Sequence, residues 1–151
     1  MTVKALEESI RPASAFLPDD RSGTTDLYND VETLASATGI DTRDYDEALI
    51  ELSLNTIAST GTLDVTILES SVGTTAAGAN AITGAAFSQK SNGDSGVYVG
   101  RIQVKNNKRY LYVKAEQAIA TSKKYGVNVI LGKSEKEPVT QANTAEFTVT
   151  Y

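Results

Sequence analysis

Short stretches of alternating apolar and polar residues, separated by turn residues, dominate the chain between residues 27 and 132. In the clearest of them, every second residue from Ala48 to Leu54 is apolar and most residues between are polar. A second stretch alternates from Leu63 to Ile67, after a short glycine-containing link. Successive side chains of a strand point to opposite faces of a sheet, so this period of two predicts strands with one buried face. The short link predicts that the two strands form a hairpin.

Three further stretches, 97–104, 110–115 and 125–131, have the same character. Gly100 interrupts the first of them, which predicts a β-bulge. The asparagines between Lys105 and Lys108 predict the turn of a second hairpin, because Asn tolerates the backbone angles of tight turns. About six or seven strands at this spacing are typical of an antiparallel sandwich.

The predicted fold is therefore all-β, an antiparallel, jelly-roll-like β-sandwich. No strand alternates with a convincing amphipathic helix of about 10–15 residues, so a parallel α/β fold is not expected. Residues 69–96 are rich in small and polar residues and are predicted to form a loop system. The most regular alternations predict a core that includes Leu52, Leu54, Val65, Ile67, Val113, Val127 and Val129.

The two ends of the chain differ from this central domain, which is assigned to residues 27–138. Residues 1–26 contain Pro12 and Pro18 and show no period that would bury their apolar groups, so they are predicted to form an extended arm that reaches a neighbour. The alternative is a disordered tail, the usual state of termini. Residues 139–151 form a tail whose final alternation predicts a last strand, either on the domain's own sheet or on a neighbour's edge.

Composition removes most catalytic designs. The sequence has no Cys and no His, which excludes Ser-His-Asp triads and metal sites built on thiolate or imidazole. Four carboxylates are close together at Asp41, Asp44, Asp46 and Glu47, but they match no calcium loop and Arg43 offsets their charge, so a solvated strand entrance is expected. No glycine-rich phosphate loop is present. No catalytic residue, cofactor or metal is predicted.

Charge is unevenly distributed along the chain. The net charge is −5, but residues 1–100 carry −10 and residues 101–136 carry +7. Such asymmetry favours oriented association with other proteins. The basic segment is interleaved with tyrosines, which is also typical of proteins that bind single-stranded nucleic acid. The isoelectric point of 4.7 argues against this function, because the negative charge of the rest of the protein would repel the phosphates. A basic protein-contact face is expected.

No targeting segment is expected in this sequence. Glu7 and Glu8 stand where a secretory peptide would be apolar, and no run approaches the roughly 18 apolar residues of a membrane span. We therefore expect a protein made in a cytoplasm, with no membrane partner.

A characteristic succession of strand and turn segments occurs in residues 41–50, 63–70, 99–114 and 126–132, followed by Pro138-Val139. In this succession the chain resembles the small β-sandwich structural proteins encoded beside the major capsid protein of many tailed bacteriophages, some of which resemble capsid cement or decoration proteins. The resemblance covers about residues 40–139 and includes no catalytic motif. It implies a non-enzymatic cement protein on the outer surface of the virion head. Its partners would be the major capsid protein and further copies of itself, as a dimer or trimer.

The expected partner contacts are the apolar groups of the arm and tail and part of the basic segment, namely Phe16, Leu17, Pro18, Arg101, Lys105, Lys108, Arg109, Phe147 and Tyr151. The alternative function is a carbohydrate- or ligand-binding β-sandwich module of a phage tail or fibre, or of a cell surface. A solvent-facing aromatic platform would favour that alternative. An enzyme is the third and least supported class.

Overall fold

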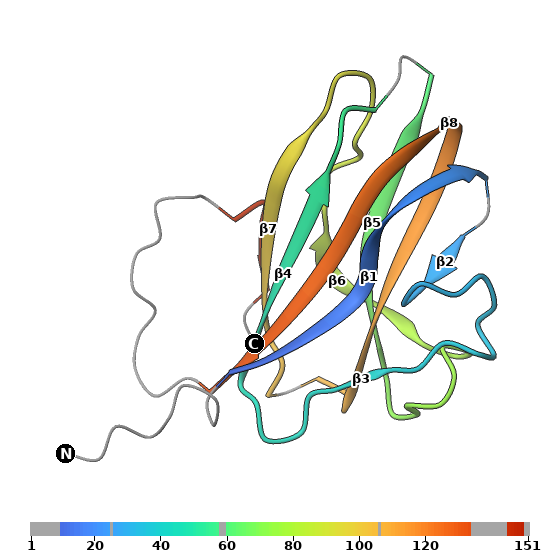
Figure 1. Ribbon diagram of the computed structural model, residues 1–151. Helices are drawn as coiled ribbons and strands as arrows, with labels where there is room; N and C mark the ends of the chain where they lie inside the picture. Colours follow the sequence, from blue (N-terminus) through green and yellow to red (C-terminus); the bar gives the residue numbers. More distant parts are fainter. Residues whose placement is uncertain (1–9, 25, 58–59, 106, 134–144, 150–151) are drawn as a thin grey trace.

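The computed structural model describes residues 10–24, 26–57, 60–105, 107–133 and 145–149 (Figure 1). The described residues contain strands and no helix, which confirms the all-β prediction. In chain order the strands are β1 (Ile10–Gly23), β2 (Leu27–Tyr28), β3 (Ile40–Asp41), β4 (Glu47–Leu54), β5 (Thr62–Ser70), β6 (Asn80–Ala86), β7 (Gly96–Gln103), β8 (Tyr110–Gly132) and β9 (Phe147–Val149).

The 23-residue strand β8 belongs to both layers of the sandwich. Its first half, from Tyr110 to Ala118, pairs with β5, and also with the short strands β2 and β3. Its second half, from Ile119 to Gly132, pairs with β1, and part of it also with β4. Figure 1 shows the strand bending over between these halves, so that each lies in a different layer. Strands that pass from one sheet to the other form the corners of many sandwiches.

Two sheets result from this shared strand. The front sheet has the order β1-β8-β4-β7-β9, and the back sheet has β6-β5-β8, with β2 and β3 on the far side of β8. All described pairings are antiparallel except β7 with β9, which is parallel. The antiparallel sandwich prediction is thus confirmed.

The core lies between the two sheets, where the alternating patterns place it. Strand β4 alternates strictly between half-buried and buried residues, and β5 does so with one interruption at Leu68. All seven predicted core residues are buried, and Leu54 is the most exposed of them at 7%. The period of two therefore identified the correct inward face of these strands.

Both predicted hairpins are wrong. Strand β4 lies between β8 and β7, whereas β5 lies between β8 and β6, so the link from β4 to β5 crosses from the front sheet to the back sheet. Ile57, in this link, is 1% exposed and anchors the crossing. The second turn also crosses layers, because β7 pairs with β4 and β9 and not with β8. A link that contains Gly or Asn fits a crossing between sheets as well as a tight turn, so these residues do not decide between the two.

The predicted loop system and bulge are also corrected. Residues 80–86, within the segment assigned to loops, form strand β6 at the edge of the back sheet. The pairing of β4 with β7 continues without a register shift past Gly100. Gly100 therefore marks a close approach by another side chain, which is the second reason for a glycine within a strand.

The predicted arm is wrong for the residues that the structure describes. Residues 10–23 form β1, which runs antiparallel along the second half of β8, and Phe16 is fully buried. Register shifts on both sides of Phe16 break the period of two, so local alternation does not reveal this strand. Prolines are tolerated here because β1 is an edge strand. Residues 1–9 lie outside the described part of the chain.

The tail strand lies on the domain's own sheet, one of the two predicted alternatives. Strand β9 pairs with β7, with Phe147 opposite Gly100. Its Phe147 ring also meets Phe87, which follows β6 in the back sheet, edge to face with 4.9 Å between the ring centroids. The two layers are thus joined at one side by the bend of β8 and at the other by β9.

Candidate protein-binding surface

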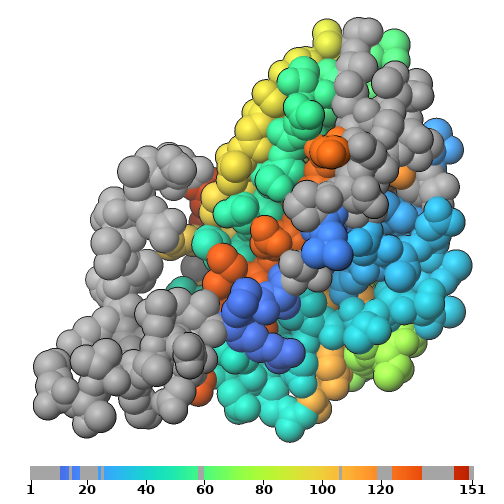
Figure 2. All heavy atoms as spheres, in the orientation of Figure 1, coloured from blue at the N-terminus to red at the C-terminus, as the bar shows by residue number. Residues whose placement is uncertain are grey.

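The described residues leave the outer face of the front sheet without a covering loop or strand. The pairing register aligns Leu49 of β4 with Ile130 of β8 and Arg101 of β7 on this face. One end of the same face aligns Ser53 with Gly126 and Val97. Figure 2 shows β7, β4, β8 and β1 following one another across it.

Two large apolar side chains on this side of the molecule are unusually exposed. Val97 is 61% exposed at the start of β7, and Leu17 is 62% exposed in β1. Leu17 follows the buried Phe16 and falls within a register shift, so it projects outward beside β8. Among the described side chains, Leu17 is therefore the one predicted apolar contact that stays at the surface, since Phe16 is in the core. The side chain of Pro18 lies outside the described residues.

A shallow groove of about 390 Å³ opens at the same end of the front sheet. Small residues form its floor, because Gly96 and Gly126 have no side chains and Ser53 has a short one. Val97 stands at one side of this groove, which Leu54, Asn55, Lys124 and Tyr125 also line. Exposed apolar surface beside a groove is a feature of protein- and ligand-binding sites.

The loops that follow β2 and β5 cover one end of the outer face of the back sheet. Tyr112 points outward from β8 and is fully buried in a small second cluster with Ala37, Leu68 and Ala76. Its hydroxyl donates a hydrogen bond of 2.8 Å to the carbonyl oxygen of Val72. Burial raises the pKa of Tyr112.

Further along β8, ion pairs take the place of apolar cover. The Nζ of Lys114 lies 3.2 Å from Asp26 and 2.7 Å from Glu116. Partial burial alone would lower the pKa of Lys114, but the hydrogen bonds to Glu116 and Asp26 outweigh it and raise the pKa. The back sheet is thus covered by loops at one end and carries partly exposed ion pairs at the other.

The predicted basic contacts separate into two places. Lys105, Lys108 and Arg109 are exposed in the loop between β7 and β8, whereas Arg101 is half-buried within the front sheet. Arg109 makes a two-pronged contact with Asp41, at 3.0 Å from Nε and 2.6 Å from Nη2. This pairing raises the pKa of Arg109. The basic loop is therefore partly neutralised by the carboxylates of the predicted strand entrance.

A cleft of about 660 Å³ separates this loop from residues 42–46. Lys105, Arg109 and Asn107 line one side of it, and Asn107 has a side-chain amide whose polar atoms are buried without a hydrogen-bond partner. The cleft lies at the end of β4 opposite the groove beside Val97.

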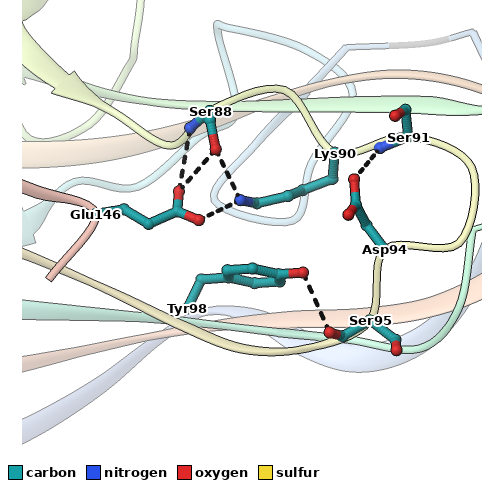
Figure 3. Close-up of polar contacts among 7 residues, drawn as sticks. All are labelled: Ser88, Lys90, Ser91, Asp94, Ser95, Tyr98 and Glu146. Atoms are coloured by element: carbon teal, nitrogen blue, oxygen red, sulfur yellow. Dashed lines mark hydrogen bonds and ion pairs between the residues drawn. The ribbon is translucent and has the colours of Figure 1, made fainter. Parts of the chain in front are cut away.

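The residues that sequence reasoning missed lie where β9 meets the sandwich (Figure 3). Lys90 is only 3% exposed, although Lys is rarely buried. Its Nζ forms an ion pair with the carboxylate of Glu146, lies 3.0 Å from Ser88 Oγ, and stands 3.7 Å from the centre of the Tyr98 ring. The backbone N–H and the hydroxyl of Ser88 both donate to the second carboxylate oxygen of Glu146, at 3.1 and 3.2 Å.

The ring of Tyr98 completes this cluster from β7. Burial, followed by the negative charges of Asp94 and Glu146, raises the pKa of Tyr98. No motif in the sequence marks Lys90 or Ser88, because the partner residue is more than fifty positions away.

Phe147, a predicted partner contact, is instead 7% exposed and packs on its own domain. A Cβ placed on Gly100 would lie 2.0 Å from the Cζ of Phe147, so the ring rests directly on the backbone of β7. Gly100 is the sequence signal for this contact, although a glycine within a strand also predicts a bulge. Tyr151 lies outside the described residues.

Other chemistry is limited in the described residues. They hold no group of three or more His, Cys, Asp or Glu side chains that could bind a metal ion. Within the same residues, no helix has the length and apolar character needed to span a membrane.

No protein-family model and no curated protein matches this sequence. Among solved structures, the chain is similar to the structure of infectious bursal disease virus Gx strain, with 15% sequence identity and a TM-score of 0.45. The similarity covers 82% of this chain and 32% of the other, so this chain spans about a third of that one. At this TM-score the likeness carries no argument about function, and the function proposed below rests on the residues of this chain.

Proposed function

We propose that this chain is a non-enzymatic virion structural protein, a capsid cement protein that binds the outside of a phage head and bridges neighbouring capsid subunits. One observation carries the proposal. The outer face of the front sheet keeps Leu17 and Val97 in water, with Val97 beside a groove, whereas loops cover part of the corresponding face of the back sheet. The resemblance of its strand and turn pattern to that of cement proteins supports the choice of a capsid shell as the partner.

Attachment through this face would work by mass action. A protein that binds only the assembled shell stabilises that shell over its separate subunits. Burying a large apolar side chain contributes about 1.5–3 kcal/mol before ordering costs, so one copy of the protein gains a modest amount. Many symmetric copies multiply this gain. The exposed Lys105 and Lys108 would add electrostatic steering toward an acidic shell surface.

The carbohydrate-binding alternative receives no support from the aromatic residues. Such a module would present a solvent-facing aromatic platform. Every Phe and Tyr whose side chain is described is buried or half-buried. We therefore propose no sugar site.

The proposal predicts that Leu17→Glu and Val97→Glu weaken attachment to purified heads by about tenfold or more each. Each change places a charge on the apolar face, and a charge without a partner in an interface is costly. Sedimentation of labelled protein with heads measures the effect. Leu34→Glu is the matched control, because Leu34 is 40% exposed and belongs to a loop away from this face. Unchanged attachment by both front-sheet variants, with circular dichroism showing that they are folded, would exclude this face as the contact.

A further inference from the structure

The described part of the tail is held to the sandwich through a compact set of contacts. Strand β9 has three residues and pairs with β7 alone, so its backbone contributes little. The remaining hold comes mainly from two neighbouring side chains. Glu146 binds Lys90 and Ser88, and Phe147 lies between Gly100 and Phe87. We call this site, formed by Ser88, Lys90, Tyr98, Gly100 and Phe87, the tail groove.

The tail groove is built for a carboxylate followed by an aromatic ring. Lys90 is buried, and an ammonium taken out of water is costly unless a counter-charge accompanies it. Glu146 supplies that charge in the geometry that Figure 3 shows. The bare backbone of Gly100 admits a flat ring at a distance that no other residue would allow. The groove therefore favours the order Glu-Phe over most other dipeptides.

Nothing in these contacts depends on which copy supplies the tail. Eleven residues, 134–144, connect Lys133, which follows β8, to Ala145. A chain of that length spans at most about 36–40 Å, which is comparable with the width of a small domain. A tail tethered to its own domain has an effective concentration in the millimolar range, so a dilute copy keeps its own tail. Copies fixed side by side on a shell reach similar local concentrations.

We propose that β9 is exchangeable, and that the tail groove receives Glu146 and Phe147 of a second copy when copies are held next to each other. The occupant is chemically identical to the one in the closed copy, and it adds by strand pairing to the edge of β7. The biological use of this exchange rests on the proposed function, in which many copies of the protein lie side by side on a virion. Exchange would link cement proteins to one another in addition to the shell.

The test uses two full-length variants, Lys90→Glu and Glu146→Lys. Each alone places like charges in its tail groove, which disfavours the closed form. When the two variants exchange tails, one groove regains the native pair of Lys90 with Glu146, and the other holds the same pair with its charges reversed. We expect the equimolar mixture to contain about ten times more two-chain complexes than either variant alone, as measured by native mass spectrometry.

The control is the double variant Lys90→Glu/Glu146→Lys in one chain, which restores opposite charges without exchange and should stay monomeric when dilute. A mixture that behaves as the sum of its parts, while the double variant is folded, would overturn the proposal. Because heads are absent from this experiment, its outcome is independent of the attachment test.

A synthetic peptide of residues 144–151 provides a second measurement if a charge-reversed chain does not fold. The fluorescent peptide should bind full-length wild-type protein weakly and saturably. A peptide that carries Glu146→Lys should bind at least about tenfold more weakly. Equal binding of both peptides, or no binding of either at millimolar concentration, would exclude an exchangeable tail.

Discussion

At the scale of single residues, the contact between Gly100 and Phe147 shows how one missing side chain can fix the position of a terminal strand. The Phe147 ring occupies the space that a Cβ on residue 100 would need. Gly100 does not have a positive φ, so its role is spatial rather than conformational. Alanine at this position would fit the backbone and clash with the ring.

Gly100→Ala should therefore lower the free energy of unfolding by about 1–3 kcal/mol, the usual cost of overpacking. In a Phe147→Ala background the same change should cost much less, because the ring that it meets is gone. Urea denaturation of the four proteins of this double-mutant cycle measures the coupling. Additive effects of the two substitutions would mean that the ring does not lie on Gly100.

At the scale of elements, β8 is the strand on which both sheets depend. Its residues 125–131 lie between β1 and β4, and residues 111–115 lie between β5 and the strands β2 and β3. Every other described strand is either at an edge or confined to one sheet. Opening β8 requires the disruption of both layers at once.

Amide hydrogen exchange should show this dependence. We expect the amides of residues 111–115 and 125–131 to exchange most slowly, at rates set by global unfolding. The amides of β9 and β2 should exchange much faster, because these strands are short and lie at edges. Nuclear magnetic resonance of the exchanging protein measures both groups in one experiment. Fast exchange in either half of β8 would show that the two sheets open independently.

The same elements show what local sequence could and could not predict. Alternation identified the buried face of β4, β5 and β8, because the side-chain period depends on the strand itself. Strand partners depend on contacts between distant residues, so the hairpins were wrong. Register shifts beside Phe16 interrupt the alternation of β1, so the local pattern did not predict this strand. Glu146, the ion-pair partner of Lys90, is too distant in the sequence for the pair to be recognised. Of the predicted contacts, Leu17, Lys105, Lys108 and Arg109 are exposed, whereas Phe16 and Phe147 are buried.

At the scale of the whole molecule, the two faces of the sandwich differ in what covers them. The back sheet carries the buried Tyr112 cluster and the ion pairs of Lys114, whereas the front sheet faces solvent at Val97 and Leu17. Loops thus cover part of the back sheet, whereas the outer face of the front sheet keeps two large apolar side chains at the surface.

The burial of Tyr112 predicts that the folded protein loses stability at alkaline pH. Burial raises the pKa of Tyr112 in the folded state above the value of about 10 that Tyr has in an unfolded chain. The raised pKa of Lys114 acts in the same direction. Folded protein thus holds these protons to higher pH than unfolded protein. The stability that they contribute is full below about pH 10 and is lost as the pH rises through the folded-state values.

Tyr112→Phe should move the alkaline unfolding transition to higher pH, because the group that must ionise is gone. At pH 7 it should cost about 0.5–1.5 kcal/mol through the lost hydrogen bond to Val72. Thermal melts between about pH 7 and pH 11, with tyrosinate absorbance recorded in parallel, measure both effects. An alkaline transition unchanged by this substitution would show that Tyr112 does not control it.

The position of β8 in the chain has a consequence for how this protein is made. A ribosome synthesises residues 10–103, which include seven of the described strands, before any residue of β8 exists. Among the pairings that the structure describes, those seven strands can form only β4 with β7 and β5 with β6 in the meantime. Both layers must wait for residues 110–132, so the nascent chain carries unpaired strands and exposed apolar faces for most of its synthesis. Chaperones that hold such chains would act on this protein before its folding is complete.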